Sequence, residues 1–151
     1  MGAVYFYHLT DSLLEEALPQ LIDRAQGQGW RVLVRGRRAA LLERLDAVLW
    51  QGPPETFRAH GLAGDHDADQ PILLGVDVPT TGFACVMSVD GTDLTPAEIA
   101  AAERACILFD GHDGDALARA RGQWKALTAA AVKAQYWAQD DGRWVKKAEA
   151  G

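Results

Sequence analysis

The chain has few cysteines and no long hydrophobic run. Its only two cysteines, Cys85 and Cys106, lie in apolar stretches without the spacing of metal ligands, which is typical of reduced core residues in a cytosolic protein. No apolar run approaches the ~18 residues that cross a bilayer. The N-terminus lacks the basic and apolar regions of a signal peptide, and Phe6 stands where a myristoylation signal has Ser or Thr. We therefore expect a cytoplasmic protein without membrane association.

Positive charge is also scarce. The 151 residues include 15 Lys and Arg against 21 Asp and Glu, which gives a net charge of −6. Binding to phosphate backbones depends on basic side chains, so we expect little direct nucleic-acid binding. Hydrophobic residues make up 48% and charged residues 24%, values that are close to the globular average. The length predicts a single domain over residues 1–151, with a tail from about residue 140 that can be flexible.

The sequence lacks the motifs of common catalytic sites. No phosphate-binding loop follows a predicted strand, no dinucleotide fingerprint opens a helix, and there is neither a nucleophile elbow nor a zinc-protease motif. His60, His66, Asp67 and Asp69 are close together in the sequence. A hydrated polar loop is a simpler interpretation of this group than a metal site. We therefore predict no catalytic residue, no metal and no cofactor.

Strand and helix patterns alternate along the chain. Apolar runs rich in β-branched and aromatic residues predict strands at about 3–9, 30–35, 72–75, 83–88 and 104–110. Helical periodicity predicts helices at about 11–28, 38–50, 96–102 and 113–139. Pro19 predicts a kink in the first helix, or a helix that starts nearer to the proline. The alternation predicts the α/β class, as a single Rossmann-like, three-layer domain whose mostly parallel sheet has helices on both faces.

One group of apolar side chains surrounds a proline turn. Trp50 ends the second helical pattern, and Phe57 and Leu62 follow the Gly-Pro-Pro segment at 52–54. Because prolines restrict the backbone, an aromatic surface at this turn would be preorganised for binding. Trp50 and Phe57 could equally pack into the core, and the sequence leaves both interpretations open.

A second group lies on the last predicted helix. Arg121 and Lys125 are four residues apart and share a face, with Trp124 beside them. An anionic partner would offset the repulsion between the two cations, and arginine can bind a carboxylate with two parallel hydrogen bonds. This pattern favours a receptor for an acidic peptide with an aromatic end. The alternative is a solvated basic face with Trp124 turned inward.

Two further surfaces suggest rival functions. His8 ends the first strand and His112 follows the strand at 104–110, so a small-molecule or nucleotide-dependent enzyme could use this sheet edge. Two hydrogen-bonded structural histidines are the simpler interpretation. A basic cluster near the second strand could bind single-stranded DNA together with aromatic residues, although a solvated surface explains it equally; its members are Arg31, Arg35, Arg37 and Arg38.

Two motifs resemble the chi subunit family of DNA polymerase III. The more specific motif is Arg44-Leu-Asp-x-x-Leu-Trp50 followed by Pro54-Glu-x-Phe57-x-x-His60-x-Leu62. The other is Arg121-x-x-Trp124-Lys125. The resemblance covers nearly the whole chain. It implies a Rossmann-like fold without nucleotide chemistry, in a non-catalytic clamp-loader accessory subunit that links the replisome to single-stranded DNA-binding protein (SSB).

The resemblance also implies particular binding residues. In the family, an apolar pocket and nearby basic residues hold the acidic C-terminal tail of SSB, which ends in Pro-Phe. The matching positions here are Trp50, Arg121, Trp124 and Lys125. The surface for the small psi subunit would include Phe57, and we place Leu62 beside it.

Two positions depart from the family pattern. Trp124 replaces the family's usual tyrosine, and Asp110 stands where an apolar pocket residue is expected. A larger indole can still form the wall of a pocket for a phenylalanine ring. The enzyme hypothesis at His8 and His112 is the alternative function.

Overall fold

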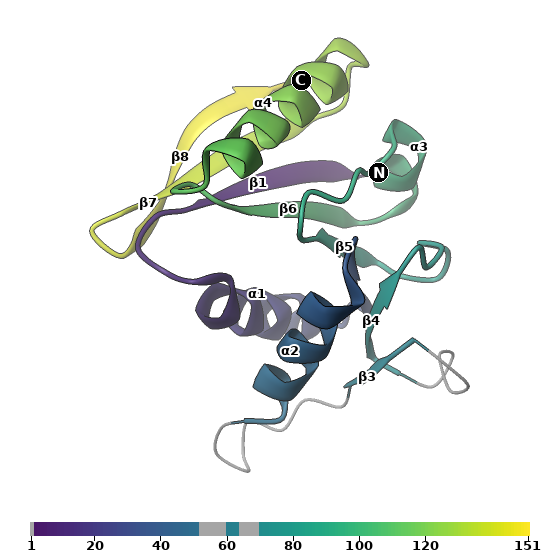
Figure 1. Ribbon diagram of the computed structural model, residues 1–151. Coiled ribbons are helices and arrows are strands. Elements are labelled where there is room, and N and C mark those ends of the chain that lie inside the picture. The colour runs from purple at the N-terminus through teal and green to yellow at the C-terminus, as the bar shows by residue number, and fades with distance from the viewer. Residues whose placement is uncertain (1, 52–59, 64–69) are drawn as a thin grey trace.

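The computed structural model describes residues 2–51, 60–63 and 70–151, and the predictions for Phe57 lie outside this part of the chain. Figure 1 shows strands and helices alternating for most of its length. In chain order the elements are β1 (Ala3–Leu9), α1 (Leu14–Gly27), β2 (Val32–Gly36), α2 (Ala39–Leu49), β3 (His60–Leu62), β4 (Ile72–Val76), β5 (Cys85–Ser88), α3 (Pro96–Ala101), β6 (Arg104–Asp110), α4 (Gly114–Ala129), β7 (Ala134–Asp140) and β8 (Arg143–Ala150).

The strands form one sheet in the order β3-β4-β2-β5-β6-β1-β7-β8. All neighbouring pairs are parallel except β7 and β8. The central strands β2 and β5 are buried along their whole length, which explains why their sequences are continuous apolar runs rather than alternating ones. The predicted α/β class with a mostly parallel sheet is therefore confirmed.

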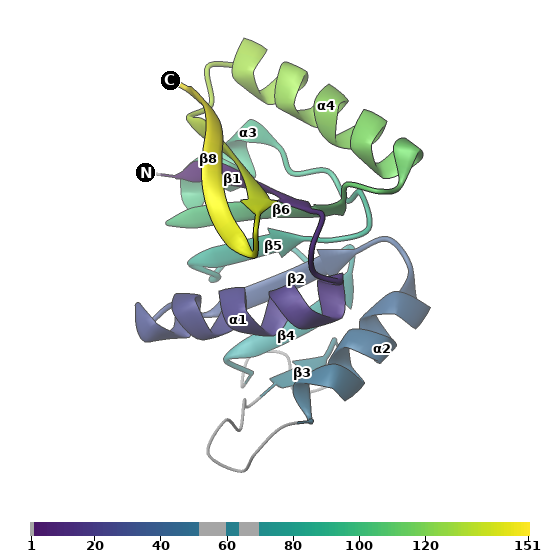
Figure 2. The same ribbon diagram turned by 90° about the vertical axis from the view of Figure 1, so that its left-hand side faces the viewer.

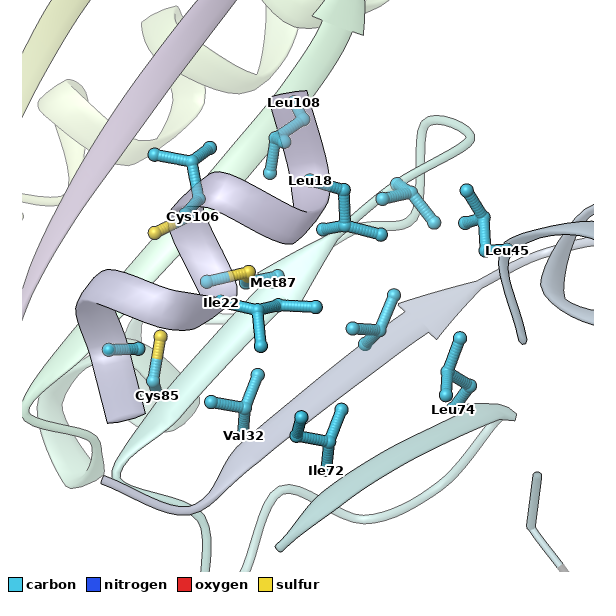
Figure 3. Packing of buried hydrophobic residues seen from close by; sticks show 14 of the residues in the cluster. Leu18, Ile22, Val32, Leu45, Ile72, Leu74, Cys85, Met87, Cys106 and Leu108 are labelled. Atoms are coloured by element: carbon cyan, nitrogen blue, oxygen red, sulfur yellow. The ribbon is translucent and has the colours of Figure 1, made fainter. Parts of the chain in front are cut away.

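Helices cover both faces of the sheet. Successive residues of a strand point to opposite faces, and β2 accordingly places Val32 in one apolar core and Leu33 in the other. The first core packs α1 and α2 against the sheet through residues such as Ile22 and Leu45 (Figure 3). The second core contains residues of α3 and α4, among them Ile99 and Leu127. Helices on both faces were predicted, and this arrangement confirms them.

The helix ends follow local sequence signals. Thr95 caps α3, since its hydroxyl accepts a hydrogen bond from the Glu98 amide (3.1 Å) while Glu98 Oε1 accepts one from the Thr95 amide (2.9 Å). Pro96 occupies the first helical position, where its missing N–H costs nothing. The prediction that α1 starts nearer to Pro19 is wrong, because the helix begins at Leu14 and continues through the proline.

The predicted last helix is the main error. α4 ends at Ala129 rather than near residue 139, and residues 134–150 form the β7–β8 hairpin. Asp141 and Gly142 join the strands, both with positive φ (51° and 76°), as a two-residue hairpin turn demands. The predicted tail is therefore strand β8. The alanine-rich run at 126–134 favours a helix locally, but pairing of β7 with β1 overrides that preference.

In the described part of the chain, no helix is long and apolar enough to span a bilayer.

Candidate functional site

Hydrogen bonds on one side of α4 fix how the helix is oriented. Arg119 Nε donates to the carbonyl of Gly91, and Gln123 Nε2 donates to Asp93 Oδ1 at 2.9 Å. The N-terminus is capped by Asp113, whose carboxylate accepts from the Asp115 amide at 3.0 Å. The side bound to residues 91–93 is thus occupied by the protein itself. Arg121, Trp124 and Lys125 lie elsewhere on the helix surface.

Trp124 turns toward the sheet and keeps part of its surface accessible. Its ring packs edge-on against Phe6 of β1 (5.3 Å between centroids) and Tyr136 of β7 (5.8 Å). Both neighbours belong to or border the second core. These contacts hold the indole in one orientation while its remaining surface faces solvent, so it combines features of both interpretations drawn from the sequence.

The two basic residues beside Trp124 have no acidic partner among the described residues. Arg121 and Lys125 are exposed, and neither makes an ion pair with another described residue. Burial raises the pKa of the Tyr136 hydroxyl, and the positive charge of Arg121 acts in the opposite direction. Arg121 is therefore close enough to Tyr136 for its charge to act on the hydroxyl. We call Arg121, Trp124, Lys125 and Tyr136 the α4 surface.

The strand-end histidines adjoin this surface. His8 Nδ1 lies 2.8 Å from the Tyr136 hydroxyl, and its ring packs 5.1 Å from Phe109. Burial lowers the pKa of the His8 imidazole, and the nearby His112 and Arg121 lower it further. His112 Nε2 in turn lies 2.7 Å from the Thr10 carbonyl. Both histidines thus have partners within the fold.

No candidate metal site accompanies these histidines in the described residues. No group of three or more His, Cys, Asp or Glu side chains there could hold a metal ion. Asp110 contributes a carboxylate close to both histidines. Its Oδ1 accepts a hydrogen bond from the His112 amide at 2.9 Å, and its charge acts on His8. It is exposed at the end of β6. The contacts of His8 with Tyr136 and of His112 with the Thr10 carbonyl favour a structural role for these two histidines.

Trp50 lies far from the α4 surface. It caps the C-terminal end of α2, is 57% exposed, and its ring lies 4.5 Å from that of His60 on β3. β3 is separated from β1 by five strand spacings, or about 24 Å along the sheet. Figures 1 and 2 show α2 and α4 at opposite ends of the molecule. The chain therefore does not bring Trp50 into one pocket with Arg121, Trp124 and Lys125.

Trp50 instead shares the β3 edge with Leu62. Leu62 ends β3 and is 42% exposed. The buried His60 ring packs against the exposed indole and is itself held in place, since its Nε2 lies 3.1 Å from the Asp46 carbonyl of α2. We call Trp50 and Leu62 the β3-edge surface.

Most of the basic cluster near β2 has partners inside the fold. Arg35 donates two hydrogen bonds to the Glu98 carboxylate (2.8 and 2.9 Å), and these bonds lower the pKa of Glu98 to about 2. Arg38 pairs with Asp90 at 2.8 Å. Arg31 donates to the Gln70 carbonyl and stacks over Phe83. These contacts favour a structural role for three of the four arginines, whereas Arg37 is exposed.

Tyr136 was not predicted as a residue of the α4 surface, because the sequence pattern placed it in the last helix. A signal was available, since Asp141-Gly142 is a strong hairpin turn sequence. A strand ending at residue 140 places Tyr136 and Trp137 on opposite faces of the sheet. Tyr136 then joins Phe6 and Trp124, as observed.

Comparison with known proteins supports the family resemblance. A solved structure described as the C-terminal domain of a possible DNA helicase from Lactobacillus plantarum WCFS1 is similar in fold, with a TM-score of 0.51 and 13% sequence identity. The match covers 78% of this chain and 79% of that one. No curated protein matches the chain. The family model described as DNA polymerase III chi subunit, HolC, matches residues 1–135. The chain therefore belongs to the chi subunit family, an accessory subunit of DNA polymerase III.

Proposed function

We propose that this protein is a non-catalytic, cytoplasmic adaptor that links the clamp loader to SSB by binding the acidic SSB tail at the α4 surface. The observation that carries the proposal is the pair of exposed cations, Arg121 and Lys125, which lack acidic partners among the described residues although the chain has a net charge of −6. They flank a half-exposed indole that the fold already holds in place.

The proposed contact combines one aromatic anchor with charge-assisted hydrogen bonds. The terminal phenylalanine of the tail packs against Trp124 and Tyr136, and its carboxylate accepts hydrogen bonds from the Arg121 guanidinium. Because Phe6 and Tyr136 already fix Trp124, binding costs little side-chain entropy there. The cations are exposed, so added salt screens the interaction and weakens it.

The β3-edge surface is the proposed contact with a second clamp-loader subunit. Trp50 and Leu62 are 57% and 42% exposed, and tryptophan is common at the centre of protein interfaces. Because this surface lies at the opposite end of the sheet from α4, one molecule can hold both partners at once. A psi-like subunit is the expected partner, with Phe57 as a further contact residue.

A peptide titration tests the adaptor function. A fluorescent acidic peptide ending in Pro-Phe should bind the full chain, and the same peptide without its last residue should bind at least about 10-fold more weakly. Trp124→Ala should cause a similar loss of affinity, because the terminal phenylalanine ring of the peptide loses its stacking partner. Arg37→Ala is the matched charge control and should bind normally, since Arg37 lies in the loop after β2. Equal binding of the two peptides would refute the proposal.

A further inference from the structure

Aromatic side chains also gather on the sheet face opposite α4. Tyr5 and Tyr7 alternate with Phe6 along β1 and therefore point away from Trp124. Tyr5 stacks on Trp137 (6.5 Å between centroids), and Tyr7 meets Trp144 edge-on (5.0 Å). Together with Trp30, they border the core under α1 and α2. We call these five residues the aromatic face, which holds three of the chain's five tryptophans.

On this side of the sheet, none of the described helices covers the strands that carry most of the aromatic face. In Figure 2, α1 and α2 lie over the lower strands of the sheet, while no helix lies in front of β1 and β8. Tyr5, Trp30, Trp137 and Trp144 are each partly accessible to solvent. Side chains with such large apolar rings gain most from complete burial. A row of half-exposed rings is therefore open to a partner with flat apolar surfaces.

A cavity adjoins the aromatic face beneath the end of α1. It has a volume of about 340 Å³, which is within the range of small-molecule sites. Its floor includes Cys85, Met87 and Cys106, whose sulfur atoms lie under α1 in Figure 3. Tyr7 and Trp30 provide aromatic walls. This lining suits a planar, mostly apolar group such as a nucleobase.

Two arginines that border the cavity lack acidic partners in the part of the chain that the structure describes. Neither Arg24 nor Arg104 makes an ion pair with a described residue. The Arg104 guanidinium lies 4.3 Å from the Tyr5 ring centroid and 5.2 Å from that of Trp30, so cation–π contacts hold it in place. Burial raises the pKa of the Tyr7 hydroxyl, against which Arg104 and Arg24 act.

We propose that the aromatic face and its cavity bind single-stranded DNA. Bases stack on the exposed parts of Trp30 and Trp137, one base enters the cavity, and Arg24 and Arg104 contact phosphates. Stacked rings beside basic side chains are the usual means of binding single strands without sequence preference. An acidic peptide would satisfy the arginines but has no series of flat groups for the rings. A single nucleotide would fill the cavity but would not contact the rings of Trp137 on β7 and Trp144 on β8.

This inference goes beyond the adaptor function. With a net charge of −6, the isolated protein should bind DNA weakly. A molecule held on SSB through the α4 surface would meet the neighbouring strand at a high effective concentration. The two surfaces are on opposite faces of the sheet, so they do not compete for space.

Fluorescence anisotropy with the full chain tests the proposal. A labelled oligothymidylate of about 15 nucleotides should bind at low salt. Two phosphate contacts predict a slope of about −1.4 for log K against log salt, and Arg104→Ala should reduce it to about −0.7. Trp30→Ala should weaken binding by about 5-fold or more. Arg37→Ala is an equal change of charge outside the site, and it should leave both the salt slope and the affinity unchanged. Circular dichroism would verify that each variant is folded.

Four results would overturn the proposal. The first is no binding by the folded wild-type protein at about 20 mM salt. The second is an equal loss of affinity in Arg37→Ala and Arg104→Ala, which would locate binding near β2. The third is competition between the oligonucleotide and an acidic peptide ending in Pro-Phe, which would mean that both use one site. Tighter binding of thymidine monophosphate than of the oligonucleotide would likewise exclude an extended single-strand site.

Discussion

Replacement of Arg121 by alanine separates the geometry of the α4 surface from its function. In the wild-type protein this arginine is exposed. Burial lowers the pKa of His8 and raises that of Tyr136, and the positive charge of Arg121 acts to lower both. Arg121→Ala should therefore raise both pKa values, because a nearby positive charge is removed. An NMR titration of the His8 ring measures the first of these shifts. The result depends only on where the guanidinium lies and needs no partner.

The same variant should weaken binding of the SSB tail. A hydrogen bond to a charged group contributes about 1.5–3 kcal/mol when it is protected from water. Because Arg121 is exposed, we expect the variant to lose about 1–1.4 kcal/mol of binding free energy. This loss corresponds to a dissociation constant about 5- to 10-fold higher at low salt. The difference should shrink as salt is added, since exposed charges are screened.

The two measurements together can refute the reasoning in separate ways. If the pKa of His8 is unchanged in Arg121→Ala, the guanidinium does not lie near the His8 ring and the inferred geometry is wrong. If that pKa rises but peptide affinity is unchanged, the geometry holds and Arg121 is not a tail-binding residue. Arg37→Ala is the control for both, since it removes the same charge from the loop after β2.

Three more predictions follow from single contacts. Trp50→Ser should change tail affinity less than 2-fold, about 0.4 kcal/mol, because Trp50 lies on the β3-edge surface; a larger loss in the peptide titration would contradict the separation. Gly111→Ala should destabilise the fold by about 1–3 kcal/mol in urea melts, because a Cβ there would lie 2.0 Å from His8 Nε2; wild-type stability would contradict this packing. Glu98→Gln should cost about 2 kcal/mol at pH 7, because it leaves Arg35, 11% exposed, without its carboxylate. Since folding lowers the pKa of Glu98 from 4.5 to about 2, its contribution is complete above pH 4.5 and lost as the pH falls toward 2, so a cost that stays constant in acid melts would count against the ion pair.

Local signals predicted most of the elements, because burial on both sides of a strand leaves a continuous apolar run. The strand at 104–110 was predicted with the bounds that it has, and Thr95 and Pro96 marked the start of α3. The β7–β8 hairpin was not predicted. Its first strand follows an alanine-rich run, and its pairing partner β1 lies more than a hundred residues away.

The grouping of site residues could be predicted only in part. Arg121, Trp124 and Lys125 share one helix, so helical periodicity alone placed them together. Trp50 could not be placed relative to them, because its position depends on the strand order. β2, β4 and β3 extend to one side of β5, whereas β6, β1 and β7 extend to the other. Apart from β1, the strands of the first half of the chain therefore lie on one side of β5 and those of the second half on the other.

This division of the sheet explains how a small subunit can serve several partners. The first half of the chain supplies the β3-edge surface, while β1 and the second half supply both the α4 surface and most of the aromatic face. The central strands β2 and β5 between them are buried along their whole length. Each contact can therefore form on a rigid support without displacing another. For an accessory subunit of DNA polymerase III, such separation would allow the proposed contacts with the clamp loader, SSB and DNA to coexist. It predicts that a mutation at one surface leaves the affinity of the other two unchanged, so that the effects of combined mutations on binding free energy are additive.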